Sequence, residues 1–208
     1  MAWEAEENFN SYSVNGLNGG NGGSGWSGAW SAHANYKIVS ANQPPWDSSG
    51  KSVFLNSGNS DEHATRALAN PVSTGICYVA ARTGATSCNQ YVAMWRDSGG
   101  NTRAYVRFDS SGNIVLNGTN IQSYSINTWY LFAVEFDMPN NRSRVKIKEA
   151  GGNWGSWSNW VSYGSGESSI ADIRFTTAYP SNNNYWDLIS ATDPSLPPAV
   201  PKSKGYIF

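Results

Sequence analysis

The chain has 208 residues, of which 14% are charged and 13% are aromatic, and its formal net charge is −1. This length suits a single β-sandwich domain and allows roughly 70% of the surface of the unfolded chain to be buried without disulfides or metals. The lysines and arginines are scattered, which excludes a nucleic-acid groove. No apolar run is long enough to span a bilayer, which excludes a membrane-spanning helix.

The chain opens on an acidic stretch, residues 1–7, that lacks the apolar run of a secretory signal. We expect that such a signal either preceded this stretch or is not used. Residues 15–28 are rich in Gly and Asn, which alone predicts a flexible loop. Aromatic residues on both sides of it predict that the loop lies over the fold instead. They are Phe9, Tyr12, Trp26 and Trp30.

Short β-type runs separated by Gly- and Asn-containing turns follow the loop, which is the pattern of a sandwich or barrel. No segment shows a sustained helical period of apolar residues. We therefore expect one all-β domain over residues 1–191. The expected strands are 36–41, 52–56, 64–69, 75–82, 90–96, 103–109, 114–116, 129–137, 142–149, 157–162, 170–177 and 185–191.

The clearest unit is a hairpin over residues 129–149 with a turn at 138–141. Alternation of apolar and polar residues predicts that one face of this hairpin is buried and the other contacts water. Two cross-strand pairs are expected on each face. They are Val134–Val145 and Phe132–Ile147 on the buried face, and Glu135–Arg144 and Ala133–Lys146 on the polar face.

The two cysteines, Cys77 and Cys88, flank an expected hairpin turn at 83–86. That turn would place Cys77 opposite Val92 and Cys88 opposite Ala81. The sulfurs would then start roughly 13 Å apart along the ladder, beyond the reach of a disulfide. The sequence therefore favours free thiols, whereas a turn centred elsewhere would permit a bridge.

The opening segment resembles the start of bacterial surface domains of the laminin G-like, concanavalin A-like lectin and glucanase group. Its pattern is Phe9-x-x-Tyr12, Gly16-Leu-Asn-Gly19 and Asn21-Gly-Gly23-x-Gly25-Trp26-x-Gly28-Ala-Trp30. Residues 127–137 are similar to the recurring strand of that group, with Trp154 as the Trp near the tip of the following hairpin, and residues 170–189 are similar to its closing strand pair. The resemblance covers residues 6–191 and implies a two-sheet antiparallel jelly-roll sandwich.

Members of this group include lectins, glycanases, polysaccharide lyases and non-catalytic modules of cell surfaces and phage particles, so the fold alone selects no function. Its laminarinase-type glucanases carry Glu-x-Asp-x-x-Glu on one strand, with one Glu as nucleophile and the other as acid. This chain has Glu135-Phe-Asp137-Met-Pro-Asn140, and the Asn140 amide cannot act as the acid. We therefore expect no enzyme activity, and a divergent glycoside hydrolase or polysaccharide lyase is the alternative.

A structural calcium ion is a candidate because laminin G-like domains often hold one at the rim of the sandwich, through Asp side chains and backbone carbonyls. The resemblance makes Asp137 and Asp187, at strand ends, its candidate ligands, with Asp109 and Asp172 as further ones. No Asp-rich loop of calcium-binding type is present. No other cofactor is expected.

Lectins stack aromatic rings on sugars and use polar groups to bind hydroxyls. Trp154 and Trp157 are candidates for such a platform, and the alternative for both is a structural role in the hairpin tip. Trp46 follows two prolines in a loop and is expected to be exposed. Glu135 and Arg144, on the polar face of the hairpin, complete the candidate ligand-binding set.

Residues 192–208 form a Pro-rich C-terminal arm whose apolar tip, Tyr206-Ile-Phe208, suits docking on another surface. The arm, the thiols and the missing signal favour a protein of the virion exterior, such as a capsid decoration, cement or fibre domain. Its partner would be a capsid or other virion protein, and homo-oligomers are an open alternative. The second context is a secreted bacterial carbohydrate-binding or adhesion module that binds cell-surface glycans.

Overall fold

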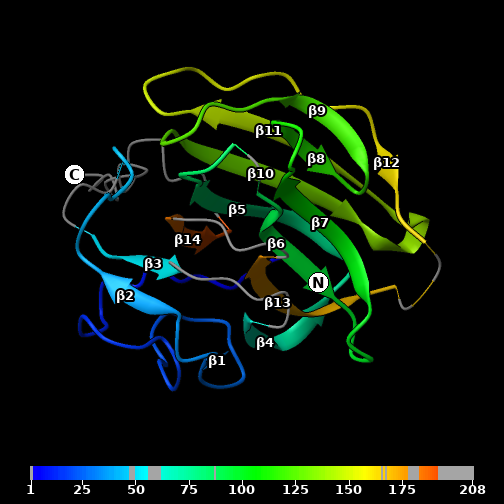
Figure 1. Cartoon of the computed structure of the whole chain (residues 1–208). Helices are drawn as coiled ribbons and strands as arrows, with labels where there is room; N and C mark the ends of the chain where they lie inside the picture. Colours follow the sequence, from blue (N-terminus) through cyan, green and yellow to red (C-terminus); the bar gives the residue numbers. More distant parts are fainter. Residues whose placement is uncertain are drawn as a thin grey trace, which may run out of the picture.

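The computed structural model describes residues 2–46, 50–55, 62–86, 88–164, 166, 168–177 and 183–191. Within these residues, β-strands make up nearly all of the regular secondary structure (Figure 1). The elements are β1 (Ser31–Ala32), β2 (Lys37–Val39), β3 (Ser52–Leu55), β4 (His63–Val72), β5 (Thr74–Arg82), β6 (Gln90–Arg96), β7 (Thr102–Phe108), β8 (Asn113–Leu116), β9 (Thr119–Ser123), β10 (Trp129–Asp137), the 3-10 turn η1 (Met138–Asn140), β11 (Arg142–Glu149), β12 (Val161–Ser162), β13 (Ile170–Thr177) and β14 (Asn184–Ser190).

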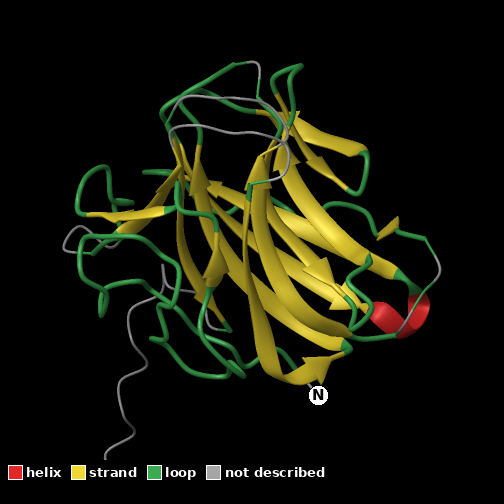
Figure 2. Ribbon diagram, turned by 60° about the horizontal axis from the view of Figure 1, so that its bottom comes forward, coloured by secondary structure: helices red, strands yellow, loops and turns green. Residues whose placement is uncertain are grey.

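The strands form two seven-stranded antiparallel sheets that stack face to face (Figures 1 and 2). The β6–β7 sheet has the order β1-β4-β13-β6-β7-β8-β9, and the β5–β10 sheet has the order β12-β11-β10-β5-β14-β3-β2. The two-sheet antiparallel sandwich expected from the sequence is therefore confirmed. In the described part of the chain, no helix is long and apolar enough to cross a membrane.

The core lies between the sheets, where the inward-facing residues of alternating positions meet. Aromatic rings fill much of it. The ring of Phe175 stacks between those of Trp30, at a centroid distance of 5.3 Å, and Trp186, at 5.6 Å. Burial of a large apolar side chain stabilises a fold by about 1.5–3 kcal/mol. The high aromatic content therefore stabilises a sandwich whose two cysteines are unbridged.

The hairpin of β10 and β11 has the predicted register. All four predicted cross-strand pairs are present, and η1 forms the turn. Asn141 closes this turn in the left-handed region at φ 50°, which asparagine tolerates better than most residues. Val134 and Val145 are fully buried, whereas Glu135 and Arg144 are half-buried on the opposite face. The expected wet face is wrong over the first part of β10, because Trp129, Leu131 and Ala133 are buried on that side as well.

Both cysteines are free, as predicted, and both are buried, but the hairpin predicted between them is wrong. β5 pairs with β10 and β14, and β6 pairs with β13 and β7, so Cys77 lies opposite Val134 rather than Val92. The chain leaves one sheet after Arg82 and enters the other at Gln90. Strands that are adjacent in sequence can complete different sheets of a sandwich, and a local turn signal does not reveal this change.

The Gly-rich loop over residues 15–28 lies on the fold, as predicted, and a buried cation holds it there. The Arg66 side chain, on β4, is 1% exposed and donates a hydrogen bond to the Glu7 carboxylate at 2.7 Å. Its other donors reach the carbonyl of Gly22 at 2.8 Å and that of Gly28 at 2.7 Å. The opening motif is thus folded around one buried ion pair.

Three further expectations differ from the structure. β1 and β9 were not expected, and the strand expected over 157–162 is reduced to β12. The expected closing strand pair, β13 and β14, is divided between the two sheets. The Pro-rich arm at 192–208 lies outside the described residues, so its docking remains a prediction.

Candidate functional site

Four predicted ligand-binding residues meet on the outer face of the β5–β10 sheet, named here the β10–β11 face. They are Trp154, Trp157, Glu135 and Arg144. The segment after β11 folds back along that strand, and its tryptophans alternate with the cations of β11. This stack, the Trp ladder, consists in order of Trp154, Lys146, Trp157, Arg144, Trp160 and Arg142. Each cation lies 4.6–5.2 Å from the centroid of a neighbouring ring.

The Trp ladder attaches a loop segment to the edge of the sheet. The Gly155 N–H donates to the Ile147 carbonyl at 2.9 Å, and the Ser158 N–H donates to the Val145 carbonyl at 2.8 Å. These bonds cover part of the β11 edge that would otherwise present unpaired backbone groups. Cation–π contacts contribute about 0.5–1 kcal/mol each at exposed sites. The geometry therefore gives the ladder a structural role.

One tryptophan position predicted from the sequence is confirmed and another is wrong. Trp154 lies near the tip of the hairpin that β11 forms with the following segment, where it forms a bridge to Lys148 beside the turn at 149–152. Trp46 is half-buried rather than exposed. It packs against an apolar cluster on the outer face of the sheet that includes Tyr78 and Trp129. The loop that holds Pro44, Pro45 and Trp46 therefore lies against this cluster instead of projecting away from the protein.

The carboxylates of the Glu-x-Asp-x-x-Asn pattern are both paired with arginines. Glu135 Oε2 lies 2.6 Å from Arg144 Nε, and Asp137 Oδ2 lies 2.7 Å from Arg142 Nη2. The Asn140 amide also donates to Asp137. Hydrogen bonds from Asn140 and Arg142 lower the pKa of Asp137, so this carboxyl is ionised at neutral pH. A general acid needs the opposite shift.

The candidate calcium ligands are far apart. Asp137 lies opposite Thr74 on β5 and Asp187 lies opposite Ala80, so roughly 20 Å of strand separates them. Asp109 accepts backbone N–H groups in the turn between β7 and β8. Among the described residues, no group of three or more His, Cys, Asp or Glu side chains is arranged to hold a metal ion. The structure therefore does not bring the predicted ligands together.

A groove with a volume of about 350 Å³ lies at the edge of the sandwich, between β9 and the segment after β11. Its walls carry neutral polar side chains, including Asn120, Gln122, Ser156 and Asn159. No aromatic or charged residue lines it among those described. The groove can donate and accept hydrogen bonds, but it offers no ring on which a sugar could stack.

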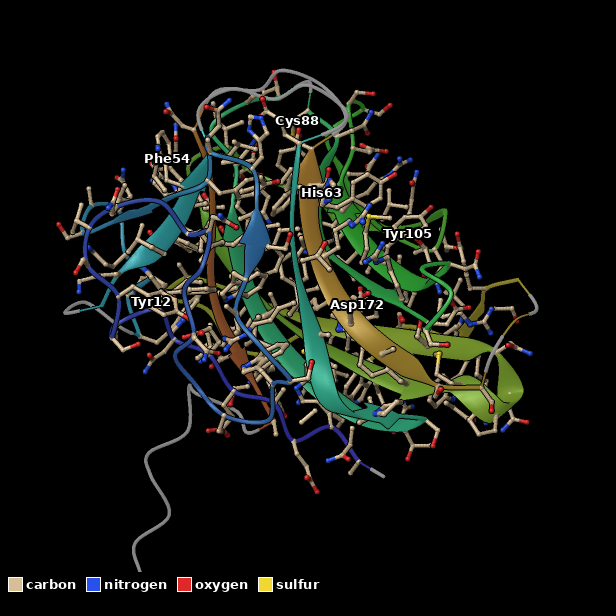
Figure 3. All side chains as sticks on the ribbon, turned by 90° about the horizontal axis from the view of Figure 1, so that it is seen from below. Tyr12, Phe54, His63, Cys88, Tyr105 and Asp172 are labelled. Atoms are coloured by element: carbon tan, nitrogen blue, oxygen red, sulfur yellow. The ribbon has the colours of Figure 1, made fainter. Side chains whose placement is uncertain are left out.

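The outer face of β4, β13, β6 and β7, named here the β6–β7 face, carries a different set of side chains. Figure 3 labels Tyr105 on this side of the sandwich and Phe54 on the opposite side. Cross-strand register places aromatic, cationic and polar residues in neighbouring rows, and most are half-buried. They are His63, Thr65, Ala67, Asp172, Arg174, Thr176, Tyr91, Met94, Arg96, Thr102, Tyr105 and Arg107.

Arg107 lies between two tyrosine rings on this face. Its guanidinium carbon is 5.7 Å from the ring centroids of both Tyr91 and Tyr105, and Nη1 is 3.4 Å from the Tyr91 hydroxyl. The Tyr163 ring packs edge-on against Tyr105. Burial raises the pKa of Tyr105, so its hydroxyl remains a donor at neutral pH. Within the described structure, Arg107 Nε has no hydrogen-bond partner.

Two other arginines lie beside this cluster. Arg96 forms a bidentate ion pair with Asp172, with both N···O distances at 2.7 Å. Arg174 donates from Nε to the Thr65 hydroxyl at 3.1 Å. The β6–β7 face thus combines tyrosine rings, on which a ligand could stack, with the planar guanidinium groups of three arginines.

Solved structures share this architecture at low sequence identity. A GH131 β-glucanase catalytic domain from Podospora anserina matches with a TM-score of 0.54 and 11% identity over 77% of this chain and 80% of that one. Peanut lectin matches with a TM-score of 0.50 and 8% identity over 88% and 96% of the two chains. The fold is a concanavalin A-like jelly roll.

This jelly roll also matches a sialidase, with a TM-score of 0.52 and 10% identity over 76% of this chain, but it spans only 16% of the sialidase. No family model matches the sequence, and no curated protein matches it. At these identities the likeness establishes the jelly roll and not its ligand.

The β6–β7 face of the jelly roll was not predicted from the sequence. The predicted site residues are tryptophans and charged residues of other segments, whereas this face is built from tyrosines and arginines. The available signal was the alternation in β7, where Tyr105 and Arg107 flank the buried Val106. The same alternation on β6 places Tyr91 on the outer face, next in sequence to the buried Val92.

Proposed function

We propose that this protein is a non-catalytic module that binds a glycan on the β6–β7 face. The observation that carries this proposal is Arg107, whose donors lie between the half-exposed rings of Tyr91 and Tyr105. Aromatic rings offer an apolar surface to the C–H groups of a sugar, while guanidinium and phenol groups bind its hydroxyls. Support also comes from the fold, since the structures that share it include a lectin and a β-glucanase domain.

The non-catalytic part of the proposal rests on the carboxylates. Glycoside hydrolysis uses two of them, one of which must be protonated before it acts. In the described rows of the β6–β7 face, Asp172 is the one carboxylate, and Arg96 binds both of its oxygens. On the β10–β11 face, Glu135 and Asp137 are each paired with an arginine. We expect no release of reducing ends from any bound polysaccharide.

A glycan array followed by calorimetry tests the proposal. The wild-type protein should bind at least one glycan, and Arg107→Ala should weaken that binding by about 10- to 100-fold, since a hydrogen bond from a charged donor contributes about 1.5–3 kcal/mol. Arg142→Ala removes the same charge from the opposite face and should leave the affinity unchanged.

The proposal fails if no glycan binds the folded protein, or if the two variants weaken binding equally. Release of reducing ends during the same incubations would instead identify an enzyme. Thermal melting of each variant checks that it remains folded.

Both cellular contexts suggested by the sequence remain proposals. Either context, the virion exterior or the bacterial cell surface, would bring the module close to glycans. The arm at 192–208, which bears on this choice, lies outside the described residues. The functions of the neighbouring genes should distinguish a capsid or tail cluster from a set of secreted proteins.

A further inference from the structure

The β6–β7 face carries an excess of positive charge. Its outward rows contain three arginines, Arg96, Arg107 and Arg174, against one carboxylate, Asp172. Arg96 and Asp172 neutralise each other's charge in their bidentate ion pair. Two guanidinium groups are therefore left on one face without a carboxylate within 4.0 Å in the described structure.

Carboxylates near the ends of the face do not balance this charge, because each is engaged elsewhere. Glu62 accepts a hydrogen bond from the Asn35 amide at 2.9 Å. Asp97 accepts from Asn101 within the turn between β6 and β7. Asp109 accepts from backbone groups in the turn after β7. Glu62 accepts its hydrogen bond through Oε1, and its Oε2 has no hydrogen-bond partner in the described structure. None of these three carboxylates lies within 4.0 Å of the guanidinium nitrogens of Arg107 or Arg174.

The opposite face of the sandwich provides a comparison within the same chain. There, Arg142 and Arg144 each pair with a carboxylate at 2.6–2.7 Å, and tryptophan rings cover both guanidinium groups. A third arginine on that side, Arg82 of β5, also has no carboxylate within 4.0 Å, but it donates to the Asn127 amide oxygen at 2.9 Å and its guanidinium carbon lies 5.2 Å from the Tyr185 ring centroid. On the β6–β7 face, Arg174 is partly desolvated beside Arg96. Burial, followed by the positive charge of Arg96, lowers the pKa of Arg174, and the nearby negative charge of Asp172 offsets only part of this shift. An anion bound here would relieve this repulsion.

We infer that the ligand of the β6–β7 face is an acidic glycan, whose carboxylate or sulfate groups pair with Arg107 and Arg174 while its rings pack on Tyr91 and Tyr105. This inference rests on the proposed function and specifies its ligand class. Arginine matches the planar geometry of carboxylates and sulfates through two parallel hydrogen bonds. The arginines of this face would thus recognise the negative charge of the glycan, and the tyrosines would recognise its sugar rings.

The test uses three oligosaccharides of equal length in calorimetry. They are an oligogalacturonate, the same oligomer after its carboxyl groups are reduced to neutral alcohols, and a sulfated oligogalactan. At least one of the two anionic oligomers should bind about tenfold or more tightly than the reduced one, with an affinity that falls as salt is added. Comparison of the two anionic oligomers distinguishes a site for carboxylates from a site for sulfates.

Two double variants then locate the contact. Arg107→Gln with Arg174→Gln should abolish the preference for anions, whereas Arg142→Gln with Lys148→Gln, an equal loss of charge on the opposite face, should preserve it. If the first pair does not fold, as judged by thermal melting, Arg174→Gln alone should reduce the preference.

Three results would overturn the inference in different ways. Equal or tighter binding of the reduced oligomer at this face rejects the acidic ligand but leaves glycan binding intact. An anion preference that survives loss of both arginines places the charge recognition elsewhere. No binding of any oligosaccharide, here or on the glycan array, rejects the proposed function as well.

Discussion

Arg66 is the residue on which the N-terminal part of the fold depends most directly. Its guanidinium is enclosed by Glu7 and loop carbonyls, and it lies 4.9 Å from the centroid of the Trp26 ring. A buried ion pair need not stabilise a fold more than an apolar pair would, but removing one partner leaves the other charge buried and uncompensated.

Glu7→Gln should therefore lower the free energy of unfolding by about 3–5 kcal/mol, and Arg66→Met by a similar amount. The double variant should lose less than the two single losses together, because neither charge is then left alone. Urea denaturation measures all three. The half-exposed Glu135–Arg144 pair is the control, for which the same cycle should give about 0–1 kcal/mol. Equal losses for the two cycles would contradict a structural role for Arg66.

Gly23 shows why glycine is required in the loop that Arg66 holds. Its φ is 71°, and a Cβ there would lie 2.0 Å from the Glu6 carbonyl oxygen. Gly23→Ala should destabilise the protein by about 2–5 kcal/mol, since the cost of the left-handed backbone adds to the overlap. Gly19→Ala is the control, because its φ is 80° but a Cβ there meets nothing within 4 Å. It should cost about 1–2 kcal/mol, and similar melting temperatures for the two variants would argue against this account.

Residue-level prediction worked where strand alternation decided the outcome. Glu135 and Arg144 were correctly placed opposite each other because both lie in one local hairpin. The role of Arg66 was not predicted, because a lone arginine is ordinarily a surface residue. The signal was present in β4, where Arg66 shares the inward face with Ala64 and Leu68.

At the scale of elements, the Trp ladder attaches the segment after β11 to the sheet edge. Trp157→Ala should lower the free energy of unfolding by about 1–2 kcal/mol, through loss of partly buried apolar area and of its contacts with Arg144 and Lys146. Glycan affinity should not change. Chemical denaturation and calorimetry on the same sample check both. A loss of affinity with unchanged stability would return the ladder to its predicted role as a sugar platform.

At this scale, the sequence predicted individual strands and the local hairpin reliably, but it did not predict which strands pair across a sheet. The strands β6, β10, β11 and β13 were predicted with their observed bounds, since each is a run of strand-forming residues next to a turn signal. The pairing of β5 with β6 was wrong, because a sandwich can place consecutive strands in opposite sheets. β9 was missed since Thr119, Asn120 and Gln122 are polar and give no alternating apolar signal.

At the scale of the whole molecule, the sandwich has two outer faces of different chemistry. On the β10–β11 face, Glu135 and Asp137 are each paired with an arginine, and Trp46 and the Trp ladder cover part of the surface. The β6–β7 face carries Arg107 and Arg174 without carboxylate partners among the described residues. The sequence predicted the architecture, and its candidate ligand-binding residues on the first face remain a prediction. The β6–β7 face could not be proposed from the sequence, because only the sheet order shows which outward residues share one surface.

Mapping of amide chemical shifts by NMR during titration with a bound glycan tests the central claim most directly. The largest shifts should follow β6, β7 and β13, around Tyr91, Tyr105, Arg107 and Arg174, and the Trp ladder should remain unperturbed. Shifts confined to β10, β11 and the Trp154–Trp160 segment, or to the groove beside β9, would contradict the assignment of the glycan site to the β6–β7 face.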